Sequence, residues 1–261
     1  MELTGVLLAI PFGIAIGVIV GAVGGGGAIL ALPVLVYVLG EGVGAASTAS
    51  LIVVAVAAGI GAGALAWRGH VCWRLALIFS GPAAAGSVLG TIANGAVDAK
   101  LLILGFVPVM AVAAGATWAQ AGEAHDDDER ECPPLPPGRI VVAGSGVGAL
   151  TGFFGVGGGF LIVPVLILWL KVTFRRAVAT SLVIITLTGL VALASHLVAG
   201  ATINLPVTIA LAGSTGAGAL LGAAVGQRLP RATLARAFAT VVACVALFLL
   251  VDTLFLNGPP R

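Results

Sequence analysis

Stretches of about 20 apolar residues recur from one end of this chain to the other, and they constrain its fold more than any other feature. A helix needs about 20 such residues to cross the hydrocarbon core of a bilayer. The chain has 261 residues, of which 60% are hydrophobic and 8% are charged, and so few charges cannot cover the surface of a soluble domain. The sequence therefore predicts an all-α integral membrane protein.

Five apolar segments lie on each side of one polar stretch. They cover residues 3–23, 28–39, 45–67, 75–92 and 101–118, and then 140–154, 160–170, 177–199, 205–225 and 234–256. The polar stretch combines a run of acidic residues with a run of prolines, which cannot sit in hydrocarbon. We therefore predict membrane repeat 1 over 1–119, an aqueous acidic and Pro-rich linker over 120–138 and membrane repeat 2 over 139–261.

The two halves carry the same residues at matching places. With a shift of 131, nine positions of the first half are identical in the second, namely Gly17, Gly21, Gly24, Gly26, Gly27, Leu30, Pro33, Val34 and Leu35. With a shift of 132, Gly81, Gly86 and Gly90 align with Gly213, Gly218 and Gly222. Chance would give roughly two or three identities in the first window. The chain therefore reads as an internal duplication.

The positions of lysine and arginine predict how the two repeats are oriented. Suppose that the first two segments of each half form a hairpin that enters and leaves the membrane by the same face. The other three segments of each half then cross the membrane, an odd number, so the second half has the opposite orientation to the first. One face then carries ten of the twelve basic residues, whereas parallel repeats would divide them seven to five. Since positive charge collects in the cytoplasm, we predict two inverted-topology repeats, each a Gly-broken helical hairpin followed by three transmembrane helices.

A cluster of glycines interrupts each hairpin, over 24–27 in the first half and 155–159 in the second. Each glycine costs a helix about 1 kcal/mol relative to alanine. Unwound backbone at membrane depth is tolerated only where it is buried in protein or lines a cavity. The segments that follow, 28–39 and 160–170, are about 18 Å and about 16.5 Å long as helices. They are therefore predicted to be half-helices that stop near the middle of a core about 30 Å thick.

We predict that the two breaks converge on an anion site. The start of each half-helix offers free N–H groups and a positive dipole end. Every lysine and arginine lies at or beyond the end of a predicted span. Hydroxyl groups near the start of the third segments, Ser47 and Thr48 among them, complete the shell. The predicted substrate-binding residues are Gly24, Gly25, Gly26, Gly27, Ser50, Gly155, Gly157, Gly158, Gly159, Thr180 and Ser181. The alternative is that the glycines allow close helix packing and the hydroxyls bond their own helix carbonyls.

His196 is the one histidine inside a predicted span. It either carries a proton in proton-coupled transport or is a neutral core histidine bonded to a neighbouring helix. Cys72, Cys132 and Cys244 show neither metal-ligand spacing nor a disulfide framework, so we expect three thiols with no shared role. No metal, cofactor or nucleic-acid partner is expected, and the sequence leaves open whether the chain works alone or as a homodimer.

The glycine breaks and the residues after them resemble the TauE/SafE sulfite exporter family. The motifs are GVGGGFLIVP at 155–164, GGGGAILALP at 24–33 and ATSL at 179–182, and the resemblance covers the whole chain apart from the linker. It implies a multi-pass protein of the bacterial cytoplasmic (inner) membrane that exports sulfite or an organosulfonate such as sulfoacetate. The positive-inside orientation then places both termini outside and the central linker in the cytoplasm.

Three classes of function are compatible with these features. A secondary transporter is the leading one, and an anion channel of inverted-repeat architecture is the alternative, because the same half-helices would also make a filter. A membrane enzyme would need an intramembrane acid, base or metal cluster, which His196 alone does not supply, so the chain is predicted not to be an enzyme. The residues do not separate sulfite from organosulfonate, and they leave the coupling ion and the direction of transport open.

The predicted orientation can be tested at the linker. A cysteine introduced at Asp127 of an otherwise cysteine-free protein should react with a thiol reagent only after the reagent has crossed the membrane, because the linker faces the cytoplasm. Labelling by an impermeant reagent in intact cells would contradict the inverted arrangement.

Overall fold

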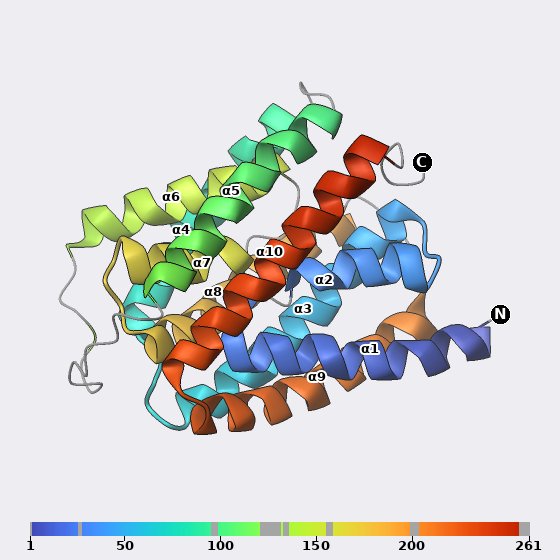
Figure 1. Cartoon of the computed structure of the whole chain (residues 1–261), viewed down its shortest axis with the longest axis horizontal. Helices are drawn as coiled ribbons and strands as arrows, with labels where there is room; N and C mark the ends of the chain where they lie inside the picture. Colours follow the sequence, from blue (N-terminus) through green and yellow to red (C-terminus); the bar gives the residue numbers. More distant parts are fainter. Residues whose placement is uncertain are drawn as a thin grey trace.

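A computed structural model describes residues 2–25, 28–94, 99–120, 132, 136–154, 159–198 and 204–255. Every regular element within these ranges is helical (Figure 1). The first half contains α1 (Glu2–Val23), α2 (Ala28–Pro33), the π-helix η2 (Val34–Val38), α3 (Val43–Ala66), α4 (Trp73–Asn94) and α5 (Ala99–Gln120). The second half contains α6 (Pro137–Phe154), α7 (Gly159–Leu168), α8 (Phe174–Val198), α9 (Leu205–Arg228) and α10 (Arg231–Phe255).

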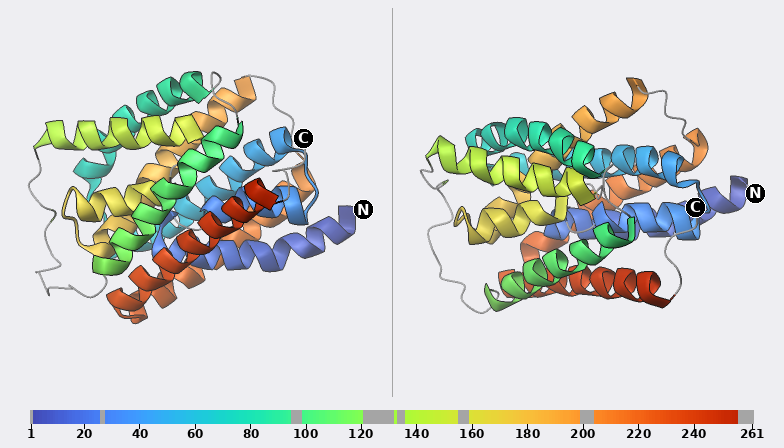
Figure 2. Two further views of the ribbon diagram at one scale, coloured as in Figure 1. Left: turned by 45° about the horizontal axis from the view of Figure 1, so that its top comes forward. Right: turned by 90° about the horizontal axis from the view of Figure 1, so that it is seen from above.

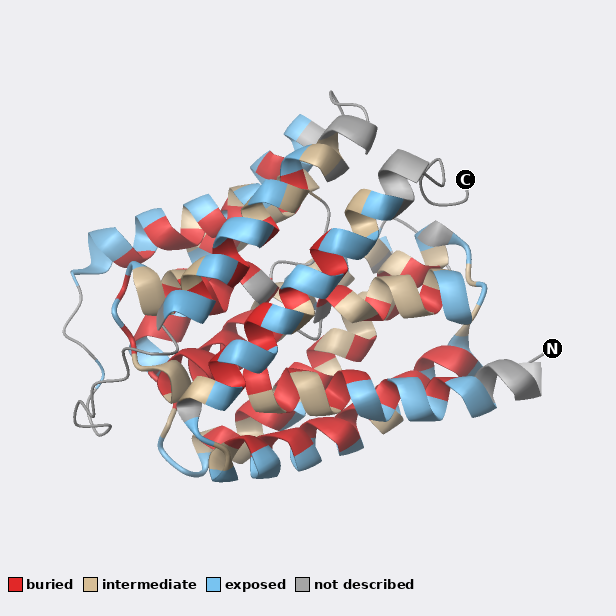
Figure 3. Cartoon of the chain, viewed as in Figure 1, coloured by how far each residue is buried: buried red, intermediate tan, exposed pale blue. Residues whose placement is uncertain are grey.

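Among the described residues, α3, α4, α8, α9 and α10 are long and apolar enough to cross a membrane. The predicted all-α integral membrane protein is therefore confirmed. Figure 3 shows exposed residues on the outward sides of α9 and α10 and buried residues on the sides that face other helices. The outward side of α9 carries leucine, isoleucine and valine, for example Ile209 and Leu221. Apolar side chains on both sides of a helix are expected where lipid replaces water as the outer solvent.

α1 is followed by the first glycine cluster, and α7 begins at Gly159, the last residue of the second cluster. α1 ends at Val23, and the next residue, Gly24, has a φ of +85°, a left-handed conformation that glycine adopts without strain. α2 and η2 together hold 11 residues and α7 holds ten. At about 1.5 Å per residue, neither half-helix reaches across a core of about 30 Å.

The two halves exchange their first helices. α1 packs along α9, and α6 packs along α4, so each half lays its first helix against the other half (Figure 1). Corresponding helices also meet directly, α3 with α8 and α5 with α10. In the right-hand view of Figure 2, α5 and α10 lie side by side along one edge of the molecule. Reciprocal contacts of this kind are what a two-fold relation between the halves produces.

Glycine allows the exchanged helices to approach this closely. A Cβ atom on Gly21 of α1 would overlap the carbonyl oxygen of Ala219 in α9, and a Cβ atom on Gly152 of α6 would overlap the carbonyl oxygen of Ser87 in α4. Gly21 and Gly152 are equivalent residues of the two halves, and so are Ser87 and Ala219. Six more matched glycines of these four helices make the same kind of contact, namely Gly17, Gly86, Gly90, Gly148, Gly218 and Gly222, whereas nothing lies within 4 Å of a Cβ atom on the matched pair Gly81 and Gly213. For these glycines, the contacts support the packing interpretation.

Two glycines of α6 provide a matched test of this contact. Gly152→Ala should destabilise the protein by about 1–3 kcal/mol, because the added methyl group overpacks the α4–α6 contact. Gly146→Ala should leave stability unchanged or raise it by about 1 kcal/mol, because nothing lies within 4 Å of a Cβ atom there. Thermal unfolding of the two purified variants in detergent measures the difference. Equal midpoints of thermal unfolding for the two variants would show that the stability of the α4–α6 contact does not require glycine at position 152.

Candidate functional site

The described ends of the two glycine breaks, Gly25 and Gly159, contact each other. A Cβ atom on Gly159 would lie 3.1 Å from both the Cα and the carbonyl oxygen of Gly25, and one on Gly25 would overlap the carbonyl of Gly159. Both glycines are buried. The backbone of one break therefore touches the backbone of the other, at the point where α7 begins.

A cavity of about 390 Å³ lies beside this contact. Its walls come from both halves and are largely apolar, with Ile29, Ile162 and Ile185 among them. The polar residues that line it are Ser47, Ser50, Ser87, Thr91, Thr151, Thr188 and His196. None of its described lining residues is a lysine, arginine, aspartate or glutamate. The cavity is mainly apolar, with several hydroxyl groups and one imidazole but no fixed charge, and its size falls within the range of small-molecule sites.

The hydroxyl groups of the cavity bond to their own helices. Ser50 Oγ donates to Ser47 O at 2.7 Å, Ser87 Oγ to Ala84 O at 2.8 Å and Thr188 Oγ1 to Ile184 O at 2.8 Å. A hydroxyl has one hydrogen to donate and rotates freely. A bound anion would therefore compete with the helix carbonyls for these hydrogens, and each hydroxyl would have to rotate toward it.

His196 joins the second half to the first through a partly buried hydrogen bond. Its Nδ1 atom lies 3.0 Å from Oγ1 of Thr48, which is fully buried in α3. Oγ1 of Thr48 also lies 3.2 Å from Gly44 O and can donate its one hydrogen there. Where Thr48 gives its hydrogen to Gly44 O, Nδ1 of His196 is the donor in the bond to Thr48 Oγ1. This bond orients the His196 ring at the cavity.

The predicted site residues occupy different places. Ser50, Gly159 and His196 line the cavity. Gly24 and Gly25 are buried at the break, where a Cβ atom on Gly24 would lie 2.9 Å from Ser181 Oγ. Gly26, Gly27, Gly155, Gly157 and Gly158 lie outside the described residues.

Thr180 does not line the cavity. Its Oγ1 accepts a hydrogen bond of 3.1 Å from the backbone N–H of Cys72. Four residues that do line it, Ser87, Thr91, Thr151 and Thr188, were not predicted. Ser87 and Thr91 are four residues apart and share a helix face, which is the one signal in the sequence that would have indicated them.

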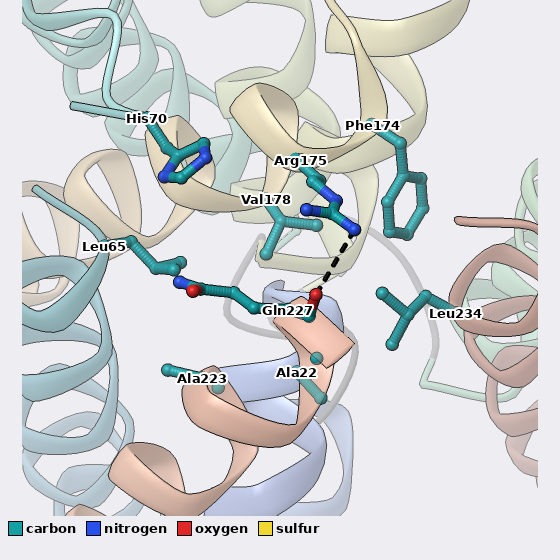
Figure 4. Close-up of a pocket in the computed structure, with 11 residues that line it drawn as sticks. Ala22, Leu65, His70, Phe174, Arg175, Val178, Ala223, Gln227 and Leu234 are labelled. Atoms are coloured by element: carbon teal, nitrogen blue, oxygen red, sulfur yellow. Dashed lines mark hydrogen bonds between the residues drawn. The ribbon is translucent and has the colours of Figure 1, made fainter. Parts of the chain in front are cut away.

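A second, smaller cavity lies at the end of the molecule where α8 begins and α9 ends (Figure 4). His70, Phe174, Arg175 and Gln227 line it, and Arg175 Nη2 donates to Gln227 O at 3.3 Å. Its volume of about 20 Å³ holds about one water molecule, which is too little for an oxyanion. We call this end, with Arg68, His70, Arg175 and Arg176, the arginine-rich end.

The environment of His70 favours its neutral form. Burial lowers the pKa of His70 below its ordinary value, and the positive charges of Arg176, Arg175 and Arg68 lower it further. Its Nδ1 atom is buried without a hydrogen-bond partner among the described residues. A proton on this ring would place a further positive charge beside three arginines.

The expectation that the three cysteines share no role is wrong. Cys72 and Cys132 form a disulfide, with their Cα atoms 5.8 Å apart, while Cys244 is free and exposed. The bridge joins the residue before α4 to the segment between α5 and α6. The two cysteines are 60 residues apart in the sequence, and no local pattern indicates that they pair.

These features define a class of protein. Apolar helices pack into a bundle around an uncharged, hydroxyl-lined cavity, and the described residues contain no group of His, Cys, Asp or Glu able to hold a metal ion. Such a cavity suits the binding and passage of a small solute, so the class is a multi-pass membrane transporter.

The family described as sulfite exporter TauE/SafE matches residues 9–249, and the chain belongs to this family. It is similar to a "Probable membrane transporter protein" of Xylella fastidiosa in two strains, Temecula1 and 9a5c, with 34% and 33% identity over 96% of this chain and 97% of each relative. It is also 33% identical to "Probable membrane transporter protein YunE" of Bacillus subtilis, over 42% of this chain and 40% of that relative. No solved structure matches it significantly.

The lowered pKa of His70 predicts how stability depends on pH. In the window between the lowered pKa and the ordinary value of about 6.5, the unfolded chain binds more protons than the folded one, so stability falls as the pH falls. The thermal midpoint of the wild type should therefore drop on acidification through this window. His70→Gln cannot take up the proton and should drop less. The same loss in both proteins would show that the charge on His70 makes no contribution.

Proposed function

We propose that this protein is a secondary transporter that exports a small sulfur oxyanion, sulfite or an organosulfonate such as sulfoacetate, and binds it where the two glycine breaks meet. The observation that carries the proposal is the contact of Gly25 with Gly159 beside an uncharged, hydroxyl-lined cavity. The description of the family as sulfite exporters supports the substrate class.

The proposed site binds an anion through dipoles. α7 begins at Gly159, and α2 begins three residues after Gly25, so the starts of both half-helices lie close to the cavity. Each helix start carries roughly half a positive charge and several free N–H groups. Two of them balance about one negative charge, which suits hydrogen sulfite or a monosulfonate. Since no charged residue among those described lines the cavity, no salt bridge has to be broken when the anion leaves.

In the proposed site, His196 is the group that can carry one proton. Thr48 holds the ring in place, and the ring lines the same cavity as Ser50 and Gly159. A protonated ring adds a positive charge when the substrate is a dianion, and a neutral ring leaves the monoanion to the dipoles. Anion and proton would then cross together.

The proposed orientation is that of inverted repeats in the bacterial cytoplasmic membrane. The reciprocal packing of α1 on α9 and of α6 on α4 supports a two-fold relation between the halves. α1 begins and α10 ends on the opposite side of the molecule from the start of α6 (Figure 1). This arrangement supports the proposal that both termini lie outside and that the linker lies in the cytoplasm with the excess of basic residues. Inverted repeats around a central site are suited to alternating access.

Efflux from proteoliposomes tests the function and the site together. Wild-type protein should export sulfite at a rate that saturates as the sulfite concentration rises. The rate through a channel would instead keep rising over the same concentrations. Ser50→Ala should raise the concentration for half-maximal transport about tenfold, because it removes one hydrogen bond to a charged ligand. His196→Ala should remove the part of the pH dependence that comes from the proton carried by the protein.

Ser195→Ala is the matched control. Ser195 is exposed on α8, beside His196, and its Oγ donates to its own helix at Val191 O, as Ser50 does to Ser47. Its variant should transport like the wild type. Unchanged transport by Ser50→Ala and His196→Ala alike would remove this cavity from the pathway, and no efflux of any sulfur oxyanion by the wild type would refute the substrate class.

A further inference from the structure

We propose that Cys72 and Cys132 form a reversible thiol–disulfide exchange site at the arginine-rich end, which dithiols open and small disulfides close. The inference rests on the contacts of the two cysteines and on the proposed cytoplasmic position of this end. It does not depend on which anion the protein transports.

The two sulfur atoms differ in their access to solvent. Cys72 is 2% exposed, whereas Cys132 is classed as exposed. Their Cα atoms are 5.8 Å apart, a separation at which a bridge opens and closes without a large movement of the backbone. A reductant therefore reaches the bridge through Cys132, and Cys72 is the sulfur that leaves.

Arg176 is placed to assist this exchange. Its side chain is 6% exposed, and its Nη1 atom lies 3.3 Å from Cys132 Sγ and 3.9 Å from Cys72 Sγ. The same nitrogen lies 3.5 Å from Gly69 O. A guanidinium group beside a sulfur atom stabilises the thiolate, which is both the nucleophile and the leaving group of exchange. Reactive cysteines occur in such electropositive, partly exposed surroundings.

The reaction proceeds in two displacements. A thiolate of an external dithiol attacks Cys132 Sγ, the bond between the two cysteines breaks, and Cys72 leaves as a thiolate beside Arg176. The second thiol of the reductant, as its thiolate, then attacks the mixed disulfide and releases the Cys132 thiolate. The reductant is thereby oxidised to its disulfide, and the two cysteine thiolates take up two protons. Exchange with a small disulfide runs the same steps in reverse.

The position of the pair favours exchange over a permanent bridge. Ten of the twelve lysine and arginine residues are assigned to this face, which the positive-inside rule places in the cytoplasm. Disulfides in that compartment are usually transient and catalytic or redox-sensing. A permanent structural bridge would require this face to lie outside, against the charge distribution.

The pair is also connected to the glycine break. The backbone N–H of Cys72 donates to Thr180 Oγ1 at 3.1 Å, and the next residue of α8, Ser181, faces Gly24 at the start of the first break. Opening the bridge removes the covalent link between Cys72, whose N–H makes this contact, and Cys132. The redox state of the pair should therefore alter the transport rate.

Counting free thiols in the folded protein tests the exchange. In a Cys244→Ser background, only Cys72 and Cys132 can react with a maleimide mass tag after denaturation. Treatment of the native protein with dithiothreitol should raise the count from zero to two, and a small disulfide should return it to zero. In cells quenched with acid during growth, the count should be two, and it should fall to zero after exposure to a thiol oxidant such as diamide.

Arg176→Gln should slow reduction of the native bridge, and Arg176→Lys should restore much of the rate, because it retains the positive charge. Reduced and oxidised wild-type proteoliposomes should differ in anion efflux, whereas Cys132→Ser should respond to neither reagent. A bridge that stays closed in unstressed cells and resists dithiothreitol in the native protein would overturn the proposal and mark a structural disulfide. Absence of sulfite efflux would refute the proposed transport function but leave the thiol counts intact as a test of the exchange.

Discussion

The structure depends on two helix–helix contacts in which glycines of one helix, which have no side chain, lie against the backbone of the other. α1 lies on α9 and α6 lies on α4, at glycines whose missing Cβ atoms leave room for the carbonyl groups of the partner helix. In a bilayer, helices gain little from burying apolar surface against each other, so close packing and backbone contacts contribute more to their association. Because each contact joins one half to the other, it also brings the glycine break that follows the first helix to the centre.

In the proposed site, the contact between Gly25 and Gly159 and the hydroxyl groups of the cavity provide polar groups without a charged residue. A buried arginine would bind an oxyanion more tightly, but it is costly within a membrane and would hold the anion when it has to leave. Helix starts and hydroxyl groups would bind an anion more weakly, and the hydroxyls of Ser50, Ser87 and Thr188 bond the carbonyls of their own helices. The arginines sit at one end instead, around His70 and the Cys72–Cys132 bridge.

The membrane class and the family could be predicted from the sequence, because segment length and glycine motifs are local features, and α2 and α7 are as short as the predicted half-helices. Ser50, Gly159 and His196 were named from the sequence and line one cavity, and their role in binding stays a prediction. Ser87, Thr91 and Thr151 were not named, since their place depends on how α4 and α6 pack together. The Cys72–Cys132 bridge was missed for the same reason, because it joins residues 60 positions apart that only the tertiary fold brings together.

The most direct test of the central claim is to locate the bound anion in a crystal of the protein soaked with selenite, whose selenium scatters anomalously. The account predicts an anomalous peak in the central cavity, within reach of the backbone at Gly25 and Gly159 and of the hydroxyl of Ser50. A peak confined to the arginine-rich end, at Arg68, Arg175 and Arg176, with an empty central cavity would contradict it. Charged side chains and not helix dipoles would then be the groups that select the anion.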